Sequence, residues 1–192
     1  MKTICVFGDS IVWGACDVEK GGWVNRLGLY FVKGNDPVLV YNLGISGETT
    51  IGVLRRFTVE ADAREPSIII FSIGINDTLD SPRPDTYTQN MQKLVELARQ
   101  RTKQLMVIGL TNVDEKRTQP VEWDSTVYYS NQRIQTYDQA LKKIAEQNKI
   151  NYVPLFGILT PDDIEDGVHP NALGHQKIYL RVKEYLLQNK LI

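Results

Sequence analysis

The stretch SIIIFSIGIND, residues 67–77, decides the fold, because a run of β-branched and aromatic residues passes directly into a polar turn. An apolar run without polar alternation is typical of a strand that is buried on both faces of a sheet. Residues 67–73 are therefore predicted to form a buried strand. Four more runs of the same character predict four more strands, at residues 3–7, 38–43, 104–110 and 150–153.

The segments between these runs carry apolar residues at helical spacing, and each spacing predicts an amphipathic helix with one inward face. The predicted inward faces are Val24, Leu27 and Phe31; Ile51, Leu54, Thr58 and Ala61; Met91, Leu94, Val95 and Ala98; Ile134, Tyr137, Leu141, Ile144 and Ala145; and Ile178, Val182, Tyr185 and Leu186. Strand and helix alternate throughout, as they must where parallel strands are joined by helical crossovers. The sequence therefore predicts an α/β fold, a three-layer α/β/α sandwich around a five-stranded parallel sheet of order 2-1-3-4-5.

Size, charge and cysteine content narrow the class of protein. The 192 residues, 42% of them hydrophobic, fit one domain over residues 1–192 with a single core. A net charge of −1 offers no field that would attract nucleic acid. The opening MKTICVFGDS is too soon interrupted by an acid for a signal peptide, and no run of about twenty apolar residues predicts membrane insertion. With only Cys5 and Cys16 and no CxxC spacing, we expect reduced thiols in a cytoplasmic protein. The oligomeric state stays open.

Polar residues gather where the predicted strands end. Gly8-Asp9-Ser10 follows the first strand, GISGET (44–49) follows the second, and GIND (74–77) follows the third. A fourth polar segment, EDGVHPN (165–171), leads into the last helix. Because ligands of open parallel sheets bind beyond the carboxyl ends of the strands, we expect these four segments to meet in one site.

The residue types in these segments suit acyl transfer. Ser10 has a hydroxyl that becomes an effective nucleophile only when an adjacent base removes its proton, and His169 is the best candidate for that base. Asp166 is placed to bind the far ring nitrogen of His169 and to stabilise the imidazolium. Pro170 disfavours helical backbone at His169 and is predicted to open the final helix.

Acyl transfer also needs hydrogen-bond donors for the oxyanion that develops on the substrate. Gly47 can present its backbone N–H close to a substrate, Asn76 can add a carboxamide, and the Ser10 N–H is a third candidate. This set needs no cofactor, and we expect no metal site.

Taken together, GDS at residues 8–10, Ser46-Gly47, GIND at 74–77 and DGVHPN at 166–171 resemble the four blocks of the SGNH, or GDSL-like, hydrolases. The blocks occur in the family's order and span nearly the whole chain. The resemblance implies a flavodoxin-like sheet and an esterase, lipase or deacetylase. It also implies Ser10 as nucleophile, His169 as base, Asp166 as its partner, and Gly47 and Asn76 as oxyanion donors. The pattern GxSxG of the α/β-hydrolases is absent.

Other polar and aromatic residues are not assigned a catalytic role. Asp9 and Asp77 are expected to make structural hydrogen bonds, and His175 to pack or to lie at the surface. Residues 111–128 form a long connection of the kind that often borders a substrate site. Trp123, with Tyr128 and Val127, either lines the substrate pocket or anchors the loop to the core, and the sequence leaves both interpretations open.

We therefore predict a serine hydrolase that cleaves a small carboxylic ester through an acyl-enzyme, with Gly47, Asn76 and Trp123 also contacting the substrate. The alternatives are a carbohydrate O-acetylesterase, an acyltransferase, and a ligand-binding module without turnover. A mononucleotide-binding protein is disfavoured, because Asp9 would repel phosphate in the first turn. The acyl-chain preference is not readable from the residues.

Overall fold

A five-stranded parallel sheet forms the centre of the protein, in a computed structural model that describes residues 2–33, 36–81 and 83–192. Its order is β2-β1-β3-β4-β5, so the predicted topology is confirmed. The strands are β1 (Lys2–Gly8), β2 (Val38–Gly44), β3 (Ile68–Ser72), β4 (Gln104–Ile108) and β5 (Asn151–Val153).

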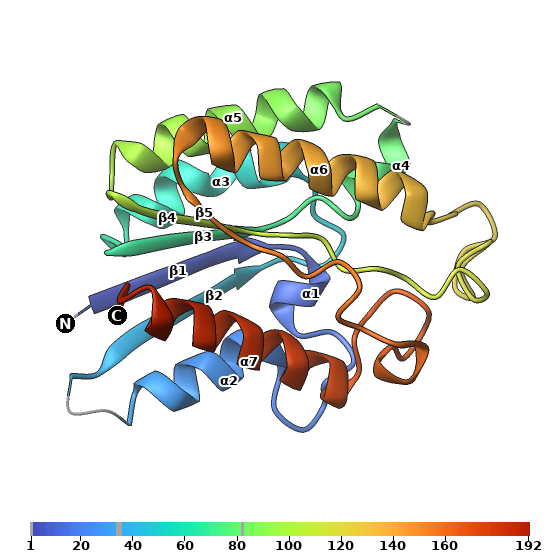
Figure 1. The fold of residues 1–192 in the computed structure, drawn as a ribbon, viewed down its shortest axis with the longest axis horizontal. Helices are drawn as coiled ribbons and strands as arrows, with labels where there is room; N and C mark the ends of the chain where they lie inside the picture. Colours follow the sequence, from blue (N-terminus) through green and yellow to red (C-terminus); the bar gives the residue numbers. More distant parts are fainter. Residues whose placement is uncertain (1, 34–35, 82) are drawn as a thin grey trace.

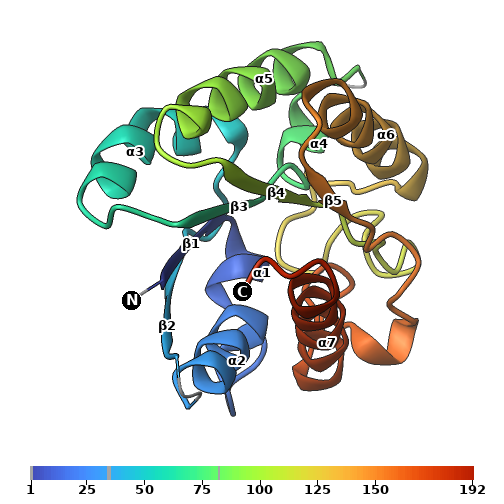
Figure 2. The same ribbon diagram turned by 60° about the vertical axis from the view of Figure 1, so that its left-hand side comes forward.

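Helices cover both faces of this sheet (Figure 1). On one face lie α3 (Thr50–Asp62), α5 (Asp85–Arg99) and α6 (Asn131–Asn148), as the turned view shows (Figure 2). On the other face lie α2 (Gly22–Phe31) and α7 (Ala172–Gln188). Three short elements sit near the carboxyl ends of the strands: α1 (Ser10–Trp13), α4 (Asp77–Asp80) and the 3-10 helix η1 (Pro161–Asp163). The predicted three-layer α/β/α sandwich is therefore confirmed.

The core is built where the two central strands meet the helices. Residues 4–7 of β1 and 68–71 of β3 are buried, as continuous apolar strands in a covered sheet require. Phe57 of α3 packs against both Phe7 and Phe71 of the sheet, with ring centroids 5.1 and 5.6 Å away. Burial of each such side chain contributes roughly 1.5–3 kcal/mol to stability, so this cluster fixes α3 against the sheet.

The predicted inward faces hold for most helices and only in part for α3. On α2, α5 and α6 every predicted apolar position is buried, and on α7 only Tyr185 stays partly exposed. On α3 the prediction holds for Ala61, which is buried, and for Leu54, which packs partly buried against the core, but it was wrong for Ile51 and Thr58. Its buried residues are Thr50, Val53, Phe57 and Ala61, whereas Ile51 and Thr58 are exposed. Phe57 sets the rotation of α3, because the largest ring on the helix enters the core.

Strand register places the predicted site segments side by side. Gly8 of β1 pairs with Gly44 of β2 on one side and with Ser72 of β3 on the other. The chain therefore leaves three neighbouring strands at one level and enters three polar turns at the same edge. Within the described residues, no helix has the length and apolar character needed to cross a membrane.

Candidate active site

Ser10 begins a short helix directly after β1. The Asp9 carboxylate caps this helix by accepting a hydrogen bond of 2.9 Å from the Ile11 N–H. Ser10 is the first residue of α1, a position where the backbone N–H has no carbonyl acceptor within the helix. The side chain is 4% exposed, so its hydroxyl lies in a protected place at the sheet edge.

The hydroxyl of Ser10 lies next to the imidazole of His169, although 159 positions separate them in the sequence. Ser10 Oγ is 2.8 Å from His169 Nε2, and His169 Nδ1 is 2.7 Å from Asp166 Oδ2. With the proton on Nδ1, the imidazole donates to the carboxylate and accepts from the hydroxyl. This tautomer leaves Nε2 free to receive the serine proton.

The turn between Asp166 and His169 holds both side chains from one short segment. Asp166 Oδ1 accepts the backbone N–H groups of His169 at 2.8 Å and of Val168 at 3.0 Å. Gly167 has φ +93°, and a Cβ there would stand 2.9 Å from atoms of Arg117 and Thr118. A side chain at Gly167 would therefore strain the turn that aims the carboxylate at the imidazole.

The start of α7 differs from the sequence prediction. Pro170 does not open the helix; it forms an isolated bridge with Ile164 instead. The helix begins at Ala172, and the Asn171 side chain caps it by accepting the N–H groups of Leu173 and Gly174. The carboxamide can satisfy two free helix N–H groups, so the helix starts after the asparagine.

The hydrogen bonds around Asp166 keep it ionised. Burial acts to raise its pKa, but the bonds from the His169 ring and from the backbone outweigh burial, and the pKa of Asp166 lies below its usual value. A carboxylate that stays negative at neutral pH stabilises a proton on the adjacent imidazole.

Asn76 lies beside the hydroxyl and is held from both ends of its amide. Its Nδ2 donates to the Glu48 carbonyl at 3.0 Å, and its Oδ1 accepts from the Tyr129 hydroxyl at 2.9 Å. The second Nδ2 hydrogen remains available for a ligand. Gly47 has φ +75° and open space where a Cβ would stand, so its backbone can approach a bound substrate closely.

These groups border one hollow of about 340 Å³. Its lining includes Ser10, Gly47, Asn76, Trp123, Val127, Tyr129 and His169. The Trp123 ring lies 5.7 Å from the His169 ring and is 52% exposed. Trp123 thus borders the hollow and is not buried as an anchor. Tyr128 is also 52% exposed but does not line the hollow, and the tyrosine that lines it is Tyr129.

Two buried acids nearby make structural hydrogen bonds, as expected. Asp77 accepts the Thr50 N–H at 3.1 Å and also binds the Thr50 hydroxyl, which fastens the start of α3 to the turn after β3. Burial raises the pKa of Asp77 and raises the pKa of Asp9 to about 7. Neither carboxylate lies in the hydrogen-bonded row from Ser10 to Asp166.

His175 is buried away from the hollow. Its Nε2 donates to the Ala15 carbonyl at 2.8 Å, and its Nδ1 accepts from the Trp23 N–H at 3.3 Å. Burial lowers its pKa. The structure therefore gives His175 a packing role and excludes it from the surface.

Sequence reasoning missed two residues at this site. Tyr129 was passed over for its neighbour, because a loop has no periodicity from which side-chain direction can be inferred. Cys16, whose thiol lies 3.9 Å from Asp166 Oδ2, was not placed near the site. Only its short spacing from Ser10 could have suggested that it lies near the site.

A serine hydroxyl, an imidazole and an ionised carboxylate in one hydrogen-bonded row, beside amide donors at a sheet edge, define a serine hydrolase site. The chain belongs to the GDSL-like Lipase/Acylhydrolase family, whose model matches residues 6–177. Family membership and this site together make it a carboxylic ester hydrolase of the serine type.

Similar proteins include two named esterases and a solved structure of the same fold. The chain is 26% identical over 179 residues to Esterase TesA of Pseudomonas aeruginosa, covering 91% of this chain and 82% of the relative. It is 25% identical over 174 residues to the Arylesterase of Vibrio mimicus, covering 88% and 80%. The crystal structure of Axe2, an acetylxylan esterase from Geobacillus stearothermophilus, matches with TM-score 0.76 and 21% identity over 94% of this chain and 92% of that one. At that identity the last likeness shows a shared fold.

Proposed function

We propose that Ser10 is the nucleophile of a two-step ester hydrolysis. His169 Nε2 takes the hydroxyl proton as Ser10 Oγ attacks the ester carbonyl, and Asp166 stabilises the imidazolium that forms. The imidazolium then protonates the leaving alcohol, which departs and leaves an acyl group on Ser10. Water attacks this acyl-enzyme with the same histidine as base. The observation that supports the proposal most strongly is the 2.8 Å contact between Ser10 Oγ and His169 Nε2.

The proposed oxyanion donors are the second Nδ2 hydrogen of Asn76 and the backbone N–H groups of Gly47 and Ser10. All three residues border the hollow that holds the hydroxyl. Tyr129 acts as a positioning residue, because its hydroxyl binds Asn76 Oδ1 and so directs Nδ2 toward the substrate. Donors that are oriented before the reaction stabilise the developing charge without reorganisation.

The proposed substrate is a small ester. A hollow of about 340 Å³ is at the lower end of the range for small-molecule pockets. Leu79 and Val127 give it an apolar side suited to a short acyl group. Trp123 presents a half-exposed ring at the same hollow, and a flat ring of this kind can also pack against a sugar. That observation favours carbohydrate O-acetylesterase activity as the second candidate.

Covalent labelling tests the nucleophile. A fluorophosphonate probe should modify the wild-type protein with one label per chain at Ser10, and Ser10→Ala should remain unlabelled. A ligand-binding module without turnover would leave the wild-type protein unlabelled as well, and that result would reject the hydrolase proposal.

A substrate panel then separates the two candidates. The panel contains p-nitrophenyl esters of increasing acyl length and acetylated xylooligosaccharides. The small-ester proposal expects kcat/KM to fall as the acyl chain outgrows the hollow. If acetylated sugars are preferred and Trp123→Ala lowers kcat/KM for them while sparing p-nitrophenyl acetate, the O-acetylesterase candidate replaces it.

We further propose that residues 1–192 act as one domain in a reducing, cytoplasmic environment. The site joins Ser10, near one end of the chain, to His169, near the other, so it needs almost the whole sequence. The two cysteines are free thiols, which is typical of such a compartment.

A further inference from the structure

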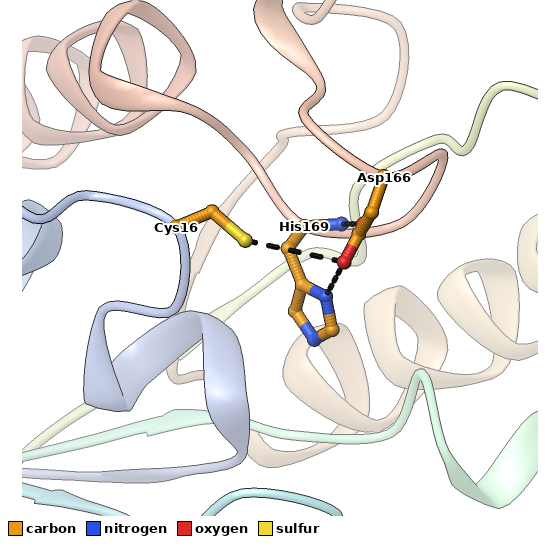
Figure 3. A group of neighbouring side chains, drawn as sticks. All are labelled: Cys16, Asp166 and His169. Atoms are coloured by element: carbon orange, nitrogen blue, oxygen red, sulfur yellow. Dashed lines mark hydrogen bonds and ion pairs between the residues drawn. The ribbon is translucent and has the colours of Figure 1, made fainter. Parts of the chain in front are cut away.

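The thiol of Cys16 lies close to Asp166, the carboxylate that also contacts His169. Figure 3 shows the thiol pointing toward the carboxylate, which in turn contacts the imidazole. Cys16 comes from the loop after α1, whereas Asp166 and His169 come from the turn before α7. Three side chains of different metal-ligating types thus converge, and their ligand atoms all lie within 4.8 Å of one another.

The spacing of these atoms suits one tetrahedral cation. Bonds of about 2.3 Å to sulfur and 2.0–2.1 Å to nitrogen and oxygen place tetrahedral ligand atoms roughly 3.3–3.6 Å apart. The measured separations are 3.9 Å from Cys16 Sγ to Asp166 Oδ2 and 2.7 Å from Asp166 Oδ2 to His169 Nδ1. The first lies above and the second below the ideal range, and all three ligand atoms lie within 4.8 Å of one another, so rotation of the side chains is needed to bring them to one centre.

Cys16 borders a hollow other than the one that contains the substrate groups. Cys16 borders a second hollow of about 470 Å³, which also includes Trp13, Val18 and Asn42. Ser10 and His169 line the other hollow. The three cluster residues are all partly exposed, and Glu165 adds a neighbouring negative charge that attracts cations. A small cation can therefore approach Cys16 from a side other than the substrate hollow.

We propose that Cys16, Asp166 and His169 form an inhibitory site for a thiophilic divalent cation such as Zn²⁺. The cation binds Cys16 Sγ, Asp166 Oδ2 and His169 Nδ1, and water completes its coordination. The thiol releases its proton to solvent. The proton on His169 Nδ1 moves through solvent to Nε2, so one proton is released for each cation bound.

Cation binding at this place stops the proposed reaction by reversing the histidine tautomer. A metal on Nδ1 leaves the proton on Nε2, and Nε2 can then no longer accept the proton of Ser10. The cation also coordinates the Asp166 carboxylate, which then no longer stabilises the imidazolium. The inhibitory effect rests on the proposed function, whereas binding of the cation does not depend on it.

Binding is tested apart from activity in the Ser10→Ala protein, which keeps all three ligands. Titration with Cd²⁺ should produce the ultraviolet charge-transfer absorption of a cadmium–thiolate bond and saturate at one equivalent. The Ser10→Ala/Cys16→Ser protein should lack this absorption. The same absorption in both proteins, or no absorption in either, would overturn the site whether or not the protein hydrolyses esters.

Inhibition is tested in the active enzyme with p-nitrophenyl acetate and increasing Zn²⁺. Cys16→Ser should raise the Zn²⁺ concentration for half-inhibition by at least about 10-fold, since even outer-shell changes cost metal sites 10- to 100-fold in affinity. Val18→Ser, at a 99% exposed position bordering the same hollow, is the matched control and should respond like wild type. A chelator should restore wild-type activity. Equal inhibition of wild type and Cys16→Ser would show that Zn²⁺ acts elsewhere and would refute the proposal.

Discussion

The two histidines lie six positions apart and occupy two opposite environments. His169 stands at the rim of the sheet, where its ring contacts a hydroxyl and a carboxylate. His175 lies in the first turn of α7, close to α2 and to the loop after α1, where both of its ring nitrogens bind backbone groups. Each ring ties the first helices of the chain to the segment around the start of α7.

Their partners impose opposite tautomers. A carboxylate at Nδ1 places the proton of His169 there, so Nε2 accepts from Ser10. A backbone N–H at Nδ1 and a carbonyl at Nε2 place the proton of His175 on Nε2. The tautomer of each imidazole therefore follows from its hydrogen-bond partners. The Asp166 carboxylate contacts His169 and can stabilise an imidazolium there, whereas both ring nitrogens of His175 bind backbone groups and burial opposes a second proton.

The largest expected difference between the two regions is in turnover. Ser10→Ala or His169→Ala should lower kcat for p-nitrophenyl acetate by about 10⁴-fold or more, as loss of a member of such a triad does. His175→Gln should keep kcat within about threefold once the protein is folded, since it removes one neutral hydrogen bond distant from the substrate. Steady-state kinetics with circular dichroism as the folding control would check both. Equal losses of kcat in His169→Ala and His175→Gln would show that the two histidines do not differ in their contribution to turnover.

Asn76 tests whether the rim also supplies oxyanion stabilisation. Asn76→Ala should lower kcat by about 100- to 1,000-fold with little change in KM, because the lost donor acts mainly in the transition state. The measurement is kcat and KM on short p-nitrophenyl esters. Unchanged turnover would remove Asn76 from the proposed oxyanion donors.

Tyr129 tests a smaller, indirect contribution at the rim. Tyr129→Phe removes the hydroxyl that holds Asn76 Oδ1 and should lower kcat by about 3- to 10-fold, the effect expected from one neutral hydrogen bond. In the Asn76→Ala background the same change should have almost no further effect. A double-mutant cycle measures this coupling, and fully additive effects would show that Tyr129 does not act through Asn76.

The region around His175 should instead govern the stability of the protein and the dependence of that stability on pH. Burial lowers the pKa of His175, so the unfolded chain binds a proton near pH 6.5 that the folded chain resists. The free energy of unfolding should therefore begin to decrease as pH falls below about 6.5, and it should continue to decrease until pH reaches the lowered pKa of the folded protein. His175→Gln should lose about 1–3 kcal/mol at pH 8 and show a smaller further loss at pH 5. Urea unfolding at both values measures this, and identical pH dependence in the two proteins would contradict the neutral, buried histidine.

Most of the fold could be predicted from the residues because continuous apolar runs, such as residues 67–73, leave little choice between strand and surface loop. The rotation of α3 could not, since Ile51 and Phe57 both compete for the inward face and only packing against Phe7 and Phe71 decides it. The start of α7 was misplaced for a similar reason, because proline and asparagine are both common near a helix start.

The candidate site was predictable where strand ends deliver residues to one edge, as they do for Ser10 and Asn76. Tyr129 and Cys16 escaped prediction because they belong to irregular segments, in which sequence spacing does not determine side-chain direction. Cys16 stands 150 positions from Asp166, and only the folded chain reveals their contact.

Trapping of the acyl-enzyme tests most directly whether His169 activates Ser10 as the nucleophile. Wild-type protein mixed with p-nitrophenyl acetate, quenched rapidly in acid and digested, should carry an acetyl group on the peptide that contains Ser10. His169→Ala should accumulate this adduct far more slowly, and His175→Gln at nearly the wild-type rate. An acetyl group at another residue during full turnover, or equal acylation rates with and without the His169 imidazole, would contradict the mechanism.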